Sequence, residues 1–289
     1  MLNEIRALGF DCAELGHATR LSLLDGIKEA VAANEIRISS LHNFCPLPLG
    51  VNGPAPDCYL PSSRNERERE LAVRHTLRTI DCAASLGAKA VVLHLGLVPV
   101  RDYTLRLLRL SADAGTQDLK FQRLLEKAFE IRARKRQPYL DQVFRTLDAI
   151  VPRAKETGVK LGLETRFGIE EIPSDDEVNE ILRRFRSEAL GYWHDVGHAQ
   201  VKENLGITSH EALLGRFRGR TAGMHLHDIA PPAFDHQPPG FGTFDFTRLS
   251  RFVSDDMILT WEIHHEWKVK QIVDSVKRAQ ELLHSPVNA

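Results

Sequence analysis

The strongest constraint on the fold is an alternation between short β-rich segments and longer segments with helical periodicity. Buried strands are predicted at residues 10–15, 36–42, 88–96, 159–165, 190–195, 221–228 and 257–263. Each strand is followed by a predicted helix, and repeated βα units indicate a parallel sheet with right-handed crossovers. The glycine-rich GxGxxG turn of dinucleotide-binding folds follows none of these strands. The pattern therefore predicts an α/β protein with the fold of a (β/α) TIM barrel.

The length of the chain and the absence of a linker in its sequence favour a single domain over residues 1–289, because a TIM barrel takes about 250 residues. Residues 1–8 read as the end of a helix, so the first of eight strands is expected to be missing. Either the sequence begins within the first βα unit or the barrel has an open seam.

Two segments depart from the regular repeat. Residues 44–64 hold five prolines and two glycines, which predicts a long ordered loop. Residues 97–137 are too long for a simple crossover and keep helical spacing, which predicts a helical insertion. The basic run at residues 132–136 within it is expected to be a solvated helical face.

Composition excludes several classes of protein. Apolar residues make up 43% of the chain and charged residues 27%, which is typical of a globular protein. The net charge of -1 provides no field that would attract nucleic acid or an anionic membrane. No apolar run approaches the ~20 residues that span a bilayer, and the first residues lack the apolar region of a signal peptide. Four cysteines without a CxxC pair are expected to be reduced thiols, so we expect a cytoplasmic protein.

One stretch, residues 192–200, combines a strand end with two polar groups. Asp195 is expected at the carboxyl end of the strand, and His198 follows it by three residues at the start of a helix. The two side chains can share one polar site. Alternatively, Asp195 only caps the helix and His198 is a solvated residue of its first turn.

Other predicted strands also end in polar residues, and barrel active sites lie at the carboxyl ends of strands. These residues are Glu14, His42, His94, Glu164, Asp195, His225 or His227, and Glu262. Carboxylates and imidazoles that converge in this way suit a divalent ion such as Mn²⁺, Mg²⁺, Co²⁺ or Zn²⁺. The alternative is a network of ion pairs with Arg166, Arg220 or Lys202.

At these residues the chain resembles the xylose isomerase-like TIM-barrel superfamily, which includes sugar isomerases and epimerases, inosose dehydratases and endonuclease IV. The resemblance covers nearly the whole chain. It rests on LGLET (161–165), WHDVGHA (193–199), MHLHD (224–228), PPGFGTFDF (238–246) and WEIHH (261–265), supported by ISSLH (38–42) and VVLHLG (91–96).

The resemblance implies one divalent metal ion and a set of site residues. The implied ligands are Glu164, Asp195, His225 or His227, and Glu262. The choice between His225 and His227 stays open, because two family patterns select different histidines. Glu164 and Glu262 would also act as acid and base on a carbon next to a carbonyl. The expected substrate-binding residues are His198, His42, His94, Glu14, Arg166 and Phe241.

The leading interpretation is a metal-dependent isomerase or epimerase of a small sugar, keto-sugar or polyol. An inosose-type dehydratase would use the same metal and base to expel water. An endonuclease IV-like repair enzyme is disfavoured because the neutral charge lacks a phosphate-binding surface. A non-catalytic sugar-binding barrel is a further alternative. A homo-oligomer is compatible with the sequence, with residues 97–137 as a lid or a subunit contact.

Overall fold

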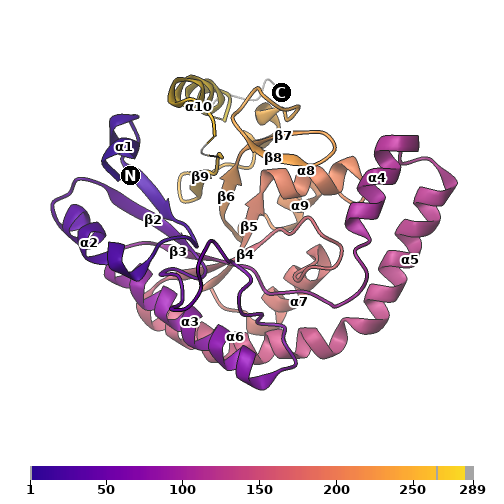
Figure 1. Ribbon diagram of the computed structural model, residues 1–289, viewed down its shortest axis with the longest axis horizontal. Helices are drawn as coiled ribbons and strands as arrows, with labels where there is room; N and C mark the ends of the chain where they lie inside the picture. Colours follow the sequence, from indigo (N-terminus) through magenta and orange to yellow (C-terminus); the bar gives the residue numbers. More distant parts are fainter. Residues whose placement is uncertain (1, 265, 284–289) are drawn as a thin grey trace. The chain divides into compact units, whose positions relative to one another are not determined.

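The computed structural model describes residues 2–264 and 266–283, and within them seven strands form one parallel sheet in chain order. The strands are β1 (Cys12–Leu15), β2 (Arg37–His42), β3 (Ala90–Leu93), β4 (Lys160–Glu164), β5 (Leu190–Asp195), β6 (Thr221–Leu226) and β9 (Ile258–Trp261). The helices between them complete the repeated βα pattern (Figure 1). The prediction of an α/β TIM-barrel fold with seven visible strands is confirmed. His265, the last residue of WEIHH, lies outside the described residues.

The chain divides into two compact units. The first unit comprises residues 1–98, 135–164 and 171–191, and the second comprises residues 99–134, 165–170 and 192–289.

The first unit contains β1 to β4 and the helices that follow them. The helices are α1 (Leu2–Ala7), the 3-10 helix η1 (Leu21–Leu23), α2 (Leu24–Ala32), α3 (Glu66–Ser85), α6 (Gln137–Thr157) and α7 (Asp175–Phe185). The strand residues Leu41, Val91 and Leu161 are fully buried, as expected for parallel strands covered by helices. Helix α3 packs against α6 (Figure 1). Helix α7 begins with a capping box in which Ser174 and Glu177 bond each other's backbone N–H groups.

The second unit contains β6, β9 and most of β5. Its helices are α4 (Thr104–Ala114), α5 (Leu119–Lys135), α8 (Val196–Asn204), α9 (His210–Arg216), the 3-10 helix η2 (Phe246–Leu249) and α10 (Val269–Leu283). Helices α4 and α5 confirm the predicted helical insertion. Their apolar side chains share a buried cluster with Ile169, Val201, Leu205 and Ile229. The insertion is therefore packed into the core of this unit.

Glu170 fixes the start of the insertion. Its carboxylate accepts hydrogen bonds from the backbone N–H groups of Tyr103 and Thr104, and from the Thr104 hydroxyl at 2.7 Å. A carboxylate at this position satisfies the first N–H groups of α4 and complements its dipole.

Several local features differ from what the sequence pattern suggests. Ser22 is a residue type that often caps helices, but it lies in η1, and α2 begins at Leu24 without a side-chain cap. Arg132 is only 5% exposed, so the basic run at residues 132–136 is not wholly a solvated face. The glycine-proline loop after β6 contains an antiparallel hairpin, β7 (Asp228–Ala230) with β8 (Phe234–Gln237). Helical spacing after the last strand predicts a closing helix over residues 267–284, and His284 lies outside the described residues.

Within the described part of the chain, no helix is both long enough and apolar enough to cross a membrane. The four cysteines are free thiols. Burial raises the pKa of the Cys45 thiol to about 12, so this side chain stays protonated at neutral pH.

Candidate metal centre

Asp195 ends β5 and caps α8, which follows without an intervening loop. The backbone N–H of His198 donates to Asp195 Oδ1 at 2.7 Å, so the expectation that Asp195 caps this helix is correct. The alternative in which His198 is solvated is wrong, because His198 is 8% exposed and its ring packs against Phe167. Both side chains are therefore fixed inside the second unit.

The His225 imidazole of the second unit faces two carboxylates, one from Asp195 and one from Glu262. His225 Nδ1 lies 3.6 Å from Asp195 Oδ2 and 3.1 Å from Glu262 Oε2. Ligand atoms about 2.1 Å from one ion lie about 3.0 Å apart in octahedral geometry and about 3.4 Å apart in tetrahedral geometry. Asp195 and His225 are fully buried, whereas the Glu262 side chain is 34% exposed. Each of the two His225 separations is compatible with a pair of ligands on one divalent ion, and Glu262 is the accessible member of the three.

His227 faces Asp195 but does not present a free lone pair. Its Nδ1 accepts the backbone N–H of His236 at 2.8 Å, so the ring hydrogen of the neutral imidazole lies on Nε2. Nε2 donates to Asp195 Oδ1 at 3.1 Å. His227 therefore orients the carboxylate, and His225 is the better candidate for a ligand.

The histidines around Asp195 keep it ionised. Burial alone would raise the pKa of this carboxyl group. The effects of His198 and His227, together with the hydrogen bond from His225, outweigh burial and hold the pKa well below its usual value. An ionised carboxylate is the form that binds a cation.

The first unit brings together three other predicted residues. Glu164 Oε2 lies 2.7 Å from His94 Nε2 and 3.5 Å from His42 Nε2, and all three side chains are buried. His42 Nδ1 donates to the carbonyl oxygen of Asn43 at 2.9 Å, which places the lone pair of neutral His42 on Nε2. His94 Nδ1 faces Asp57 at 3.1 Å. These atoms can themselves hold a cation.

The remaining predicted residues differ in their surroundings. Half-buried Glu14 accepts a hydrogen bond from the Ser40 hydroxyl at 2.6 Å, which ties β1 to β2. Arg166 is buried. Phe241 is 40% exposed, and its ring centroid lies 4.6 Å from that of Trp267.

His236 has a more specific setting than its sequence position indicated. Its ring is stacked between His227 at 4.3 Å and His264 at 4.9 Å. Its backbone has a φ of 53°, which is uncommon outside glycine and often found at functional positions. Nδ1 donates to the carbonyl oxygen of Glu262 at 3.0 Å. The signal in the sequence that could have identified His236 is its position directly after Asp235, since both are residue types that bind metals.

Asp228 was not singled out from the sequence, although it ends the MHLHD motif. Its fully buried carboxylate accepts backbone N–H groups from Ile229, Gly240, Gly242 and Phe244 at 2.8 to 2.9 Å. Asp228 therefore holds the glycine-proline loop in place. An acidic residue directly before a glycine-rich loop is the signal that could have identified it.

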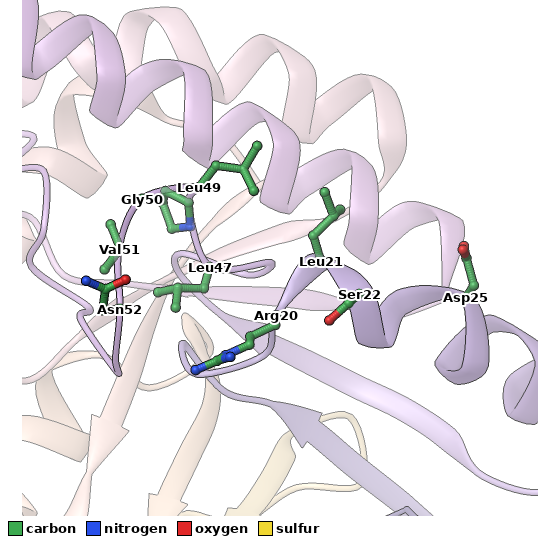
Figure 2. Close-up of a pocket in the computed structure, with 10 residues that line it drawn as sticks. Arg20, Leu21, Ser22, Asp25, Leu47, Leu49, Gly50, Val51 and Asn52 are labelled. Atoms are coloured by element: carbon green, nitrogen blue, oxygen red, sulfur yellow. The ribbon is translucent and has the colours of Figure 1, made fainter.

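A cavity of about 550 Å³ lies in the first unit, beside the loops that follow β1 and β2. Residues 20–22 and Asp25 line one side, and residues 47–52 line the other (Figure 2). Arg20 and Asp25 are its charged lining residues, and Leu49 is 79% exposed beside it.

The fold is shared with solved structures of sugar epimerases. A D-tagatose 3-epimerase-like protein is 22% identical, with 97% of this chain and 91% of that chain covered and a TM-score of 0.67. The apo form of 3-keto-D-glucoside 4-epimerase, YcjR, from E. coli is 16% identical, with coverages of 96% and 92% and a TM-score of 0.67. The IolI protein with a bound zinc atom is 14% identical, with coverages of 98% and 92% and a TM-score of 0.62. At these identities the likeness establishes the fold alone.

Two curated relatives are uncharacterised proteins. MJ1311 of Methanocaldococcus jannaschii is 28% identical over 156 residues, which cover 53% of this chain and 43% of that protein. The protein y4fM of Sinorhizobium fredii is 24% identical over 192 residues, which cover 66% of this chain and 51% of that protein. The chain spans about half the length of these curated relatives. The family described as xylose isomerase-like TIM barrel matches residues 2–285, and the chain therefore belongs to this family.

Proposed function

We propose that this protein is a metal-dependent isomerase or epimerase of a small sugar, keto-sugar or polyol. The observation that carries the proposal is His225 Nδ1, which lies 3.6 Å from Asp195 Oδ2 and 3.1 Å from Glu262 Oε2, separations that suit pairs of ligands on one divalent ion. The sugar epimerases among the structural neighbours support the substrate class.

The proposed ligands are Glu164, Asp195, His225 and Glu262. Glu164 is included because it ends β4 as Asp195 ends β5, and the family resemblance assigns ligands to these strand ends. Three carboxylates and one imidazole suit Mn²⁺, Mg²⁺, Co²⁺ or Zn²⁺. A bound ion supplies a Lewis acid that polarises a substrate carbonyl.

In the proposed reaction, one glutamate removes the proton from a carbon next to the carbonyl and the other returns a proton to it. Glu262 is the more accessible of the two, and the buried Glu164 is oriented by His94. His198 Nδ1 donates to the Thr165 carbonyl at 2.8 Å, which fixes the ring beside Asp195, and we assign contact with a substrate hydroxyl to this residue. These roles match general acid–base chemistry at a carbon acid.

A multi-metal nuclease is the second candidate, because Glu164 also forms a group with His42 and His94 that can hold a cation. The net charge of -1 opposes it, because binding to DNA phosphates requires a basic surface. A dehydratase would use the same residues as the isomerase and differ in its product. Metal content and product analysis separate these functions.

The first experiment is elemental analysis of the purified protein and of Glu262→Gln, with Glu29→Gln on the exposed side of α2 as the matched control. We expect about one equivalent of Mn, Co, Zn or Mg in the parent and the control, and its loss in Glu262→Gln. About three zinc equivalents would instead support the nuclease. The absence of bound metal after incubation with excess ions would refute the catalytic proposal and favour a non-catalytic barrel.

The second experiment tests the reaction in D₂O with a panel of keto-sugars and inososes. An isomerase or epimerase exchanges the proton next to the carbonyl for deuterium, which proton NMR detects as a lost signal. A dehydratase releases water and forms a product of lower mass. Failure of the metal-loaded protein to exchange or convert any member of the panel would count against both reactions.

A further inference from the structure

A set of hydrogen-bonded polar side chains lies buried in the second unit, beside the proposed ligands. The Thr165 hydroxyl bonds the Tyr192 hydroxyl, which lies 2.8 Å from His194 Nδ1. His194 Nε2 lies 3.0 Å from His210 Nδ1, and His210 Nε2 lies 3.2 Å from Gln200 Oε1. We call these five residues the Tyr192 network. Each of them is less than 9% exposed.

The hydrogen-bond directions in the Tyr192 network follow from its last member. Gln200 Nε2 donates to Asn204 Oδ1 at 2.8 Å, so Gln200 Oε1 is the atom that faces His210. A carbonyl oxygen only accepts, so His210 carries its hydrogen on Nε2 and accepts at Nδ1. His194 must then donate from Nε2.

The same reasoning continues to the other end of the Tyr192 network. Neutral His194 accepts at Nδ1, so the Tyr192 hydroxyl donates to it. The Tyr192 oxygen then accepts from the Thr165 hydroxyl. Each member has one orientation that satisfies its neighbours.

The imidazole of His210 is held in the neutral form, because burial lowers its pKa to about 3. The Tyr192 network ends at the primary amide of Gln200, which does not transfer protons readily. The network therefore fixes the orientation of its side chains and does not conduct protons to the surface.

The network touches the proposed site at two points. Thr165, its first member, accepts the His198 Nδ1 hydrogen bond on its carbonyl oxygen at 2.8 Å. His194 directly precedes Asp195 on β5. We propose that Tyr192, His194 and His210 are positioning residues that fix Thr165 and the end of β5, so that His198 and Asp195 keep the orientation needed for metal and substrate. This inference rests on the proposed function.

The test compares Tyr192→Phe, which removes one hydroxyl, with Tyr139→Phe on α6 as the matched control. Isothermal titration with Mn²⁺ and Co²⁺ measures metal affinity, and thermal unfolding measures stability. We expect the affinity of Tyr192→Phe to fall about tenfold, as is typical when a group that orients a ligand is lost. Tyr139→Phe should bind as the parent does. A fall in stability with unchanged affinity would show a merely structural role and overturn the proposal.

Nitrogen NMR of the histidine rings in the parent protein provides a second test that needs neither metal nor activity. We expect His194 and His210 to be neutral at pH 7, with the hydrogen of each on Nε2. A hydrogen on Nδ1 of either ring, or a charged ring, would overturn the network. If the parent binds no metal, the proposed function fails, whereas the ring tautomers still decide whether the network exists.

Discussion

The sharpest test of how the site is built is the replacement of Asp228 by asparagine. The carboxylate accepts four backbone N–H groups, with Ile229 and Phe244 on Oδ1 and Gly240 and Gly242 on Oδ2. An amide places an NH₂ group where one of these oxygens stands. Because each oxygen accepts two N–H groups, rotation of the amide does not avoid the loss.

The expected cost follows from these bonds. A hydrogen bond to a charged group contributes about 1.5–3 kcal/mol, so the loss of two predicts a destabilisation of about 3–6 kcal/mol in Asp228→Asn. The residue is fully buried, so water cannot replace the lost acceptor. Urea unfolding followed by circular dichroism measures the change, and hydrogen exchange at the Gly240 and Gly242 amides shows whether the loop opens.

The matched control is Asp235→Asn in the same hairpin, whose side chain is 28% exposed. We expect this control to change the free energy of unfolding by less than about 1 kcal/mol, as is usual for partly exposed polar substitutions. A loss below about 1 kcal/mol in Asp228→Asn, with protected Gly240 and Gly242 amides, would refute the reasoning.

Three further predictions concern pH and packing. The pKa of His210 in the folded protein is about 3, so between pH 6.5 and 3 only the unfolded state binds a proton at this residue. Lowering the pH from 6.5 to 5 should therefore decrease the free energy of unfolding, measured by urea denaturation, by about 2 kcal/mol. His210→Gln should lack this pH dependence. The hydrogen bond from Arg248 lowers the pKa of Glu211 to about 2, so ionised Glu211 stabilises the folded state above pH 4.5, and this stabilisation is lost as the pH falls through 2. Glu211→Gln should therefore lower the free energy of unfolding by about 1 kcal/mol at pH 7 and leave it unchanged at pH 2. An alanine Cβ at Gly197 would lie 2.1 Å from His227 Cε1, so Gly197→Ala should displace the His227 ring. We expect metal affinity, measured by isothermal titration, to fall about tenfold. Unchanged affinity would refute the role of His227 in orienting Asp195.

Hydrophobic periodicity predicted the strands, the helical insertion and the cap at Asp195. These features depend on residues close together in the sequence: α8 starts at Asp195 because its side chain bonds an N–H three residues away. Helices α4 and α5 keep apolar spacing over three to five turns, which is detectable without knowledge of what they contact. Local patterns therefore determined the fold class and the candidate ligands.

The tertiary structure supports the proposal that His225, and not His227, is the ligand. Alternation along the predicted strand 221–228 gives His225 and His227 the same side. The fold distinguishes them, because the His236 N–H from the β7–β8 hairpin occupies His227 Nδ1. The neutral His194–His210 pair likewise depends on contacts between β5 and α9. Tautomer, burial and hydrogen-bond direction depend on partners brought together by folding, so periodicity and spacing in the sequence do not specify them.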